Sequence, residues 1–92
     1  MAPNFQVRWT RRALTNLDGI VQFIAKDKPQ AAHKLAQAIR ARTDALQTTP
    51  NLGREVMPGL RELVVHQHYL ITYRIKSGTV EILQVWHTAR SR

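Results

Sequence analysis

The spacing of apolar residues changes once along this chain, from a helical period to the pattern of β-strands. Between residues 13 and 46 the apolar positions recur every three or four residues, which is typical of helices with one buried face. Asp27, Lys28 and Pro29 interrupt this region, and Pro29 suits the first turn of a second helix, where its missing N–H costs nothing. The region therefore predicts two antiparallel helices joined by a tight connection, the second of which ends near Pro50.

Short strands are predicted on both sides of these helices. Residues 5–9 alternate apolar and polar side chains, and Thr10 after them can cap the first helix. Residues 51–59, which carry two glycines and a proline, predict a loop. Three stretches rich in valine, isoleucine, leucine and tyrosine follow at residues 60–65, 69–75 and 80–87. The sequence therefore predicts one α+β domain over residues 1–92: a strand, a two-helix antiparallel hairpin and a three-stranded antiparallel meander.

The turn between the last two predicted strands sets their pairing. Ser77 and Gly78 suit a two-residue hairpin turn. This turn places Arg74 opposite Glu81 as a cross-strand ion pair, which has little structural value if it is exposed.

The preceding turn is less typical. His66 and Gln67, read as a second two-residue turn, would place Leu63 opposite Leu70. Strict alternation then sorts the strands into two faces. The face assigned to the helices holds Leu60, Val64, Ile71, Tyr73, Ile75, Val80, Ile82 and Trp86. The other face, expected to be open and functional, holds Arg61, Leu63, Val65, Thr72, Arg74, Leu83, Val85 and His87.

The net charge of +8 points to an anionic partner. Ten of the fourteen basic residues are arginines, whose planar guanidinium suits phosphates and carboxylates. Such a surplus is typical of proteins that bind nucleic acid or an acidic protein, and a merely solvated basic surface is the alternative. The chain has no cysteine, no signal-like N-terminus and no stretch of the roughly 18 apolar residues that a membrane span needs. We therefore expect a soluble, cytoplasmic protein.

His87 and two arginines are the candidate catalytic residues. His87 could act as a general acid or base on a phosphodiester, while Arg61 and Arg90 hold the phosphate. In principle these groups suffice for metal-free RNA cleavage, in which the 2′-hydroxyl is the nucleophile. The alternative is a histidine that caps the strand end, followed by an arginine in a solvated tail.

No metal and no cofactor are expected. His66 and His68 could suggest a metal pair, but neither a cysteine nor a nearby carboxylate completes a site. Ser91 has no acidic partner for a catalytic triad, and the chain has no glycine-rich phosphate loop.

Several motifs together resemble the RelE/ParE superfamily of toxins over nearly the whole chain. They are Val7-x-Trp9-Thr10-x-x-Ala13, Gly53-Arg54, Gly59-Leu60-Arg61-Glu62-Leu63, Tyr69-Leu70-Ile71-Thr72-Tyr73-Arg74-Ile75 and Ile82-Leu83-x-Val85-x-His87-x-x-Arg90. The resemblance implies a two-helix hairpin packed on an antiparallel sheet. It also implies a cognate antitoxin that wraps the toxin, and an operon that the pair regulates through operator DNA.

The superfamily divides by target. RelE-like members cleave mRNA in the ribosomal A site without a metal, and ParE-like members inhibit DNA gyrase. Arg61 matches a basic position of RelE, whereas Leu63, Leu70 and Thr88 stand where Lys or Arg is expected in a ribonuclease. The resemblance therefore favours the ParE-like branch.

Three functional hypotheses stay open. The favoured one is a gyrase inhibitor that is not itself an enzyme. The second is a ribosome-dependent mRNA endonuclease built on His87, Arg61 and Arg90, and the third is a non-toxic module that only binds its antitoxin. The surface expected to bind the antitoxin or the target consists of Arg61, Leu63, Leu70, Arg74, Leu83, His87 and Arg90.

Overall fold

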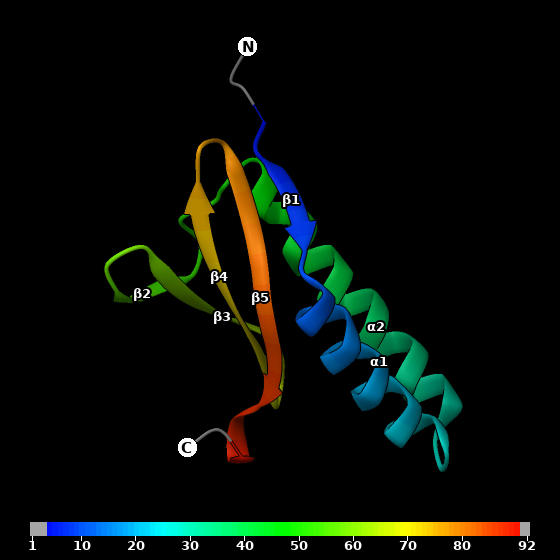
Figure 1. The fold of residues 1–92 in the computed structure, drawn as a ribbon. Coiled ribbons are helices and arrows are strands. Elements are labelled where there is room, and N and C mark those ends of the chain that lie inside the picture. Colours follow the sequence, from blue (N-terminus) through cyan, green and yellow to red (C-terminus); the bar gives the residue numbers. More distant parts are fainter. Residues whose placement is uncertain (1–3, 91–92) are drawn as a thin grey trace.

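The computed structural model describes residues 4–90, which form a five-stranded mixed sheet with two helices on one face (Figure 1). The elements are β1 (Gln6–Trp9), α1 (Arg11–Ala25), α2 (Pro29–Asp44), β2 (Arg54–Met57), β3 (Leu60–His66), β4 (Tyr69–Lys76) and β5 (Thr79–His87). The sheet order is β1-β5-β4-β3-β2, with β1 parallel to β5 and every other pair antiparallel. The predicted α+β fold class is confirmed.

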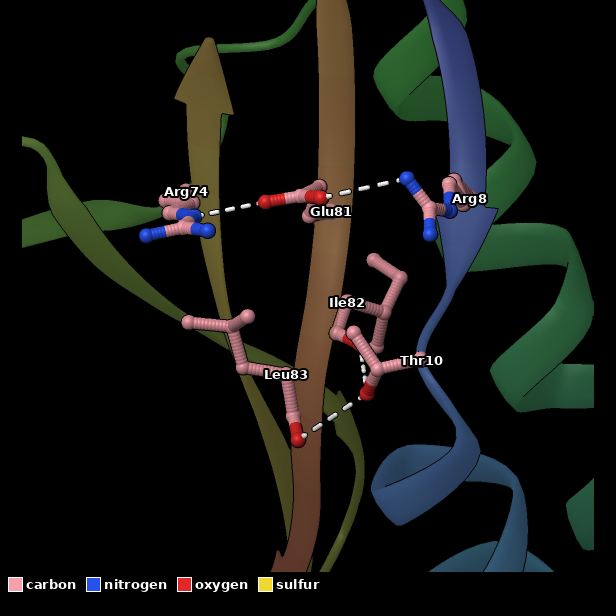
Figure 2. Close-up of polar contacts among 6 residues, drawn as sticks. All are labelled: Arg8, Thr10, Arg74, Glu81, Ile82 and Leu83. Carbon is pink, nitrogen blue, oxygen red and sulfur yellow. Dashed lines mark hydrogen bonds and ion pairs between the residues drawn. The ribbon is translucent and has the colours of Figure 1, made fainter.

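Thr10 ties the start of α1 to the last strand. Its hydroxyl oxygen accepts a hydrogen bond from the Ala13 N–H at 3.2 Å, which is the expected helix cap. The same hydroxyl donates to the Ile82 carbonyl at 2.8 Å (Figure 2). Pro29 opens α2, also as expected. One side chain therefore fixes both the beginning of the helical layer and its position on the sheet.

The core lies between the helices and the sheet. The two helices pack against each other, and on the sheet α1 packs against β5 and α2 packs against β3. Buried aliphatic side chains from both helices meet Ile71, Tyr73, Val80 and Ile82, which face the helices as the sequence predicts. No helix among residues 4–90 is long and apolar enough to cross a membrane.

The turn between β4 and β5 is the one predicted. Ser77 and Gly78 have φ angles of 50° and 77°, the positive values that a type I′ turn requires at both central positions. Arg74 accordingly stands opposite Glu81, and its Nε donates to the Glu81 carboxylate at 2.6 Å.

The predicted turn between β3 and β4 is wrong, and the faces of β3 are exchanged as a result. His66 pairs with Tyr69, so the turn residues are Gln67 and His68, and the register shifts between Val64 and His66. A register change of one residue moves every side chain of a strand to the other face. Leu63 is therefore only 6% exposed in the core, whereas Val64 is 56% exposed. Contrary to prediction, Arg61, Leu63 and Val65 lie on the helix side, and Leu60 and Val64 lie on the open face.

A bulge in β5 exchanges the faces at its end as well. Continuing the pairing from Arg74 and Glu81 would place Thr72 opposite Leu83, but Thr72 pairs with Gln84 because the register shifts by one residue at this point. Beyond the bulge Val85 and His87 lie on the helix side, and Trp86 lies on the open face. These three placements are the reverse of the prediction.

Part of the predicted 51–59 loop is a strand. β2 pairs with β3, and Arg54 stands opposite Glu62 with 3.8 Å between guanidinium and carboxylate. Glu62 therefore points to the open face. All four residues of β2 are exposed, so the strand has no apolar alternation by which the sequence could reveal it.

Candidate functional site

The candidate catalytic and binding residues predicted from the sequence do not form one surface in the structure. They fall into an anchored loop around Arg61, a charged row on the open face around Arg74, a groove at the edge of β3 around Leu63 and Leu70, and the end of β5 around His87. Each region has its own chemistry.

Arg61 anchors the loop that precedes β2. Its Nη1 donates to the Gly53 carbonyl at 2.7 Å and to the Asn51 carbonyl at 3.4 Å. The guanidinium therefore already has two backbone acceptors. This arrangement supports a structural role for Arg61 in holding the loop against β3.

Tyr73 completes the same anchor from inside the core. Its hydroxyl accepts a hydrogen bond from the Gly53 N–H at 2.7 Å and donates to the Pro50 carbonyl at 2.8 Å. Burial raises the pKa of Tyr73, while the Gly53 hydrogen bond and the charge of Arg61 act in the opposite direction. Gly53 fits because a Cβ there would stand 2.7 Å from the Glu62 carbonyl oxygen. Only glycine allows this close approach of two backbones.

A charged row crosses three strands on the open face (Figure 2). Glu81 of β5 lies between Arg74 of β4, at 2.6 Å, and Arg8 of β1, at 3.6 Å. The hydrogen bond from Arg74 holds the pKa of Glu81 below its ordinary value, and the charge of Arg8 adds to the effect. Beside this row Leu83 forms the β5 bulge, since its neighbours Ile82 and Gln84 pair with adjacent residues of β4. Its carbonyl accepts a 3.4 Å hydrogen bond from the Thr10 hydroxyl. The row joins the strands of the sheet and leaves Arg74 half exposed.

Leu63 and Leu70 meet at a groove of about 400 Å³ along the outer edge of β3, although they face opposite sides of the sheet. We call this surface the edge groove; it consists of Arg42, Leu52, Gly53, Arg54, Glu62, Leu63, Val64 and Leu70. β2 covers β3 only as far as Glu62, so the edge from Leu63 onward has no strand partner within residues 4–90. The Nε of Arg42 reaches the Val64 carbonyl at 3.4 Å. The groove thus combines a backbone edge without a strand partner among the described residues, exposed aliphatic carbons, Arg42 and the ion pair of Arg54 with Glu62.

His87 lies at the other end of the sheet. Its Nδ1 accepts a hydrogen bond from the Ala89 N–H at 3.0 Å, and its ring stands edge-on to Tyr69 with centroids 5.0 Å apart. His68 stacks on it with centroids 5.7 Å apart. Arg90 ends a short 3-10 helix after β5, and its side chain lies outside the part of the chain that the structure describes.

Arg61 and His87 are too far apart to act on one phosphate. They pair with Tyr73 and Tyr69 on β4, four residues apart, which is about 13 Å along a strand, and β4 itself lies between them. General acid–base catalysis needs groups within hydrogen-bond reach of one reacting centre. The residues described also contain no cluster of three or more histidine, cysteine or carboxylate side chains that could hold a metal ion.

Sequence reasoning missed Arg42, Leu52 and Val64 at the edge groove. Arg42 lies on the flank of α2, and its contact with β3 depends on how the layers pack. The predicted turn at His66 and Gln67 places Val64 in the core, whereas the structure exposes it. Only the run of aliphatic residues from Leu63 to Val65, without a polar residue between them, signals a strand with apolar side chains on both faces.

The chain matches known toxins along most of its length. The family model of the ParE toxin of the type II toxin–antitoxin system parDE matches residues 7–92. Toxin RelE2 of Caulobacter vibrioides is 40% identical over 85 residues, covering 92% of this chain and 97% of the relative. The putative toxin Y4kP of Sinorhizobium fredii is 46% identical over 87 residues, covering 89% and 86%.

Solved structures show the same fold. The chromosomal ParDE toxin–antitoxin system of P. aeruginosa contains a chain that matches with a TM-score of 0.79 and 27% identity, covering 90% of this chain and 95% of that one. The toxin–antitoxin complex RelBE2 of Mycobacterium tuberculosis contains a chain that matches with a TM-score of 0.61 and 26% identity, covering 91% and 98%. Both ParE and RelE names therefore occur among the similar proteins.

Proposed function

Because this chain belongs to the ParE toxin family of type II toxin–antitoxin systems, we propose that it arrests growth by inhibiting DNA gyrase and is neutralised by a cognate antitoxin. The choice of gyrase over mRNA as the target rests on one observation. His87 and Arg61 lie at opposite ends of the sheet, which does not suit joint catalysis on one phosphodiester. The toxin then acts by binding a protein in the cytoplasm, and it is not an enzyme in its own right.

The contacts of Arg61 support this proposal. A guanidinium that holds two backbone carbonyls must give up these bonds before it can bind a phosphate. The neutral aliphatic groups of Leu63 and Leu70 also supply no charge for a phosphodiester. An apolar surface rimmed by arginine suits a protein partner better.

The edge groove is the proposed binding surface of the antitoxin. An unpaired strand edge can receive an extended segment, whose backbone completes the hydrogen bonds and whose side chains fill flanking pockets. Val64 and Leu52 offer aliphatic contacts. Arg42, which makes no ion pair with a described carboxylate, favours a segment that carries carboxylates, whereas Arg54 is already paired with Glu62. A segment of the antitoxin that pairs with β3 from Leu63 onward would extend the sheet beyond the point where β2 ends.

The target is tested by inducing the toxin without its antitoxin. Purified toxin should inhibit supercoiling by purified gyrase, and induced cells should filament, show DNA damage signalling and keep their mRNA intact. Rapid cleavage of mRNA in the ribosomal A site, with normal supercoiling, would establish the ribonuclease instead.

The names RelE2 and RelBE2 among the similar proteins favour that ribonuclease as the second candidate. The variant His87→Ala separates the two candidates. An acid–base residue contributes about 10²–10⁴-fold to a rate, so a ribonuclease would lose cleavage by that factor. A toxin that leaves both gyrase and mRNA untouched, and only binds its antitoxin, would establish the non-toxic module.

The antitoxin surface is tested with two exposed valines. Val64→Glu in the edge groove should weaken the complex with the antitoxin at least tenfold, because it removes an aliphatic contact and places a carboxylate against a segment that itself carries carboxylates. Val56→Glu on β2, outside the groove, is the matched control and should bind as the wild type does. Equal affinity of both variants would exclude the edge groove.

A further inference from the structure

The helical hairpin and the sheet diverge toward the turn between α1 and α2, away from the end where β1 and Thr10 join them (Figure 1). An open hollow of about 740 Å³ lies between α1 and the end of β5. We call it the wedge; it is lined by Thr15, Asn16, Gly19, Ile20, Phe23, Tyr69, His87 and Ala89. The wedge exposes the margin of the core, since Ile20 and Tyr69 are only partly buried.

Gly19 is the first sign that something enters the wedge. Glycine in the middle of a helix is less favourable than alanine, so its presence needs a reason. A Cβ at Gly19 would meet nothing within 4 Å, and the residue does not have a positive φ. Nothing within residues 4–90 therefore requires a glycine here. A surface without a side chain lets the backbone of another element approach closely.

Phe23 is the second sign. It lies one turn beyond Gly19 on the same flank of α1, and its side chain is 72% exposed. A large aromatic ring beside an open hollow is the kind of residue that anchors a protein–protein contact. Tyr69 and His87 form the facing wall with aromatic rings held edge-on to each other.

The charges around the wedge define the partner. No carboxylate lines it. Arg12 and Lys26 lie on the same flank of α1 before and after the stretch from Asn16 to Phe23, and neither makes an ion pair with a described carboxylate. An element that carries both apolar and acidic side chains complements this surface.

We propose that the wedge receives an acidic amphipathic helix of the protein that the toxin inhibits. This inference rests on the proposed function, in which the toxin acts by binding a target protein and the antitoxin binds the edge groove. The helix crosses α1 at Gly19, inserts an apolar side chain between Phe23 and Tyr69, and presents carboxylates to Arg12 and Lys26. Target and antitoxin thus contact different surfaces of one small protein.

Two substitutions in the wedge and one matched control test this inference. Phe23→Ala removes the exposed anchor, and Gly19→Leu fills the hollow while keeping a good helix former in a position that has room for it. Leu14→Ala truncates another exposed side chain of α1, 53% exposed, which lies outside the wedge. Thermal unfolding of the purified proteins should show that all three variants fold.

Growth arrest after induction is the first readout, since it does not depend on which protein is the target. Phe23→Ala and Gly19→Leu should abolish arrest at matched expression, while Leu14→Ala stays toxic and all three bind the antitoxin. In the supercoiling assay the two wedge variants should need at least tenfold more toxin for half inhibition of gyrase.

Wild-type toxicity in both wedge variants would overturn the inference. Variants that stay toxic but escape neutralisation would also overturn it, because the wedge would then belong to the antitoxin. If the wild type arrests growth but leaves supercoiling unchanged, the gyrase proposal fails, whereas the growth comparison still decides whether the wedge binds the target.

Discussion

The hydroxyl of Tyr73 accepts a hydrogen bond from the backbone N–H of Gly53 at 2.7 Å, across 20 residues of sequence. The same hydroxyl donates to the Pro50 carbonyl, so one buried side chain holds both ends of the turn that leads into β2. The position of β2, and with it the extent of the edge groove, depends on this contact.

Tyr73→Phe should destabilise the fold by about 1–3 kcal/mol, because it leaves the Gly53 N–H and the Pro50 carbonyl without their partner. Chemical denaturation of the two proteins measures the difference. Tyr69→Phe is the control, since the Tyr69 hydroxyl makes no hydrogen bond within the described residues and its loss should cost much less. Equal losses in the two variants would contradict the anchor.

The protein should lose stability at alkaline pH through Tyr73. Burial raises the pKa of Tyr73 in the fold above its ordinary value of 10.0. The neutral hydroxyl therefore stabilises the fold fully below pH 10, and this contribution is lost as the pH rises through the raised pKa. Thermal midpoints measured from pH 8 to 11 should fall more steeply for the wild type than for Tyr73→Phe; parallel curves would count against the coupling.

Arg61→Ala should reduce stability by about 1.5 kcal/mol, because hydrogen bonds from a charged group to two backbone carbonyls are lost. Growth arrest by the protein that still folds should persist, since the guanidinium serves the loop and not the target. Arg54→Ala, which breaks an exposed ion pair of 3.8 Å, is the matched control and should change stability by about 0–1 kcal/mol. If the Arg61→Ala variant is stable but no longer toxic, Arg61 contributes to binding of the target and not only to the loop.

Glu81→Gln should make the thermal stability of the protein less dependent on pH in the acid range. Because the hydrogen bond from Arg74 lowers the pKa of Glu81 below 4.5, its contribution is present above that pH and is lost as the pH falls through the lowered pKa. The wild type and the variant should therefore converge in thermal midpoint between pH 6 and pH 3. Glu55→Gln, which breaks no ion pair, is the control and should follow the wild type.

The sequence predicts most of the fold because its strongest local signals agree with the packing. Thr10 and Pro29 have one favourable role each at a helix start, and Ser77 with Gly78 suits one turn. These positions fix both helices and the β4–β5 hairpin.

The site could not be predicted in the same way, because the face of a residue depends on counting along a strand. The register shift near Val64 and the bulge at Leu83 each change that count by one, and neither has a glycine or a proline to mark it. The sequence therefore predicts the strands of Arg61, Leu63 and His87 correctly but places these side chains on the wrong face. The bulge itself is stabilised from a distance, since the Asn16 side chain of α1 accepts a hydrogen bond from the Val85 N–H.

The pairing of β1 with β5 has a consequence for how the toxin is made. The neighbour of β1 in the sheet is β5, more than seventy residues later in the sequence. Loop closure over such a span is slow compared with the formation of local hairpins, and it requires β5 to be present. A nascent or truncated polypeptide without β5 lacks the strand that seats Thr10 and α1, so this fold is reached only after β5 has been synthesised.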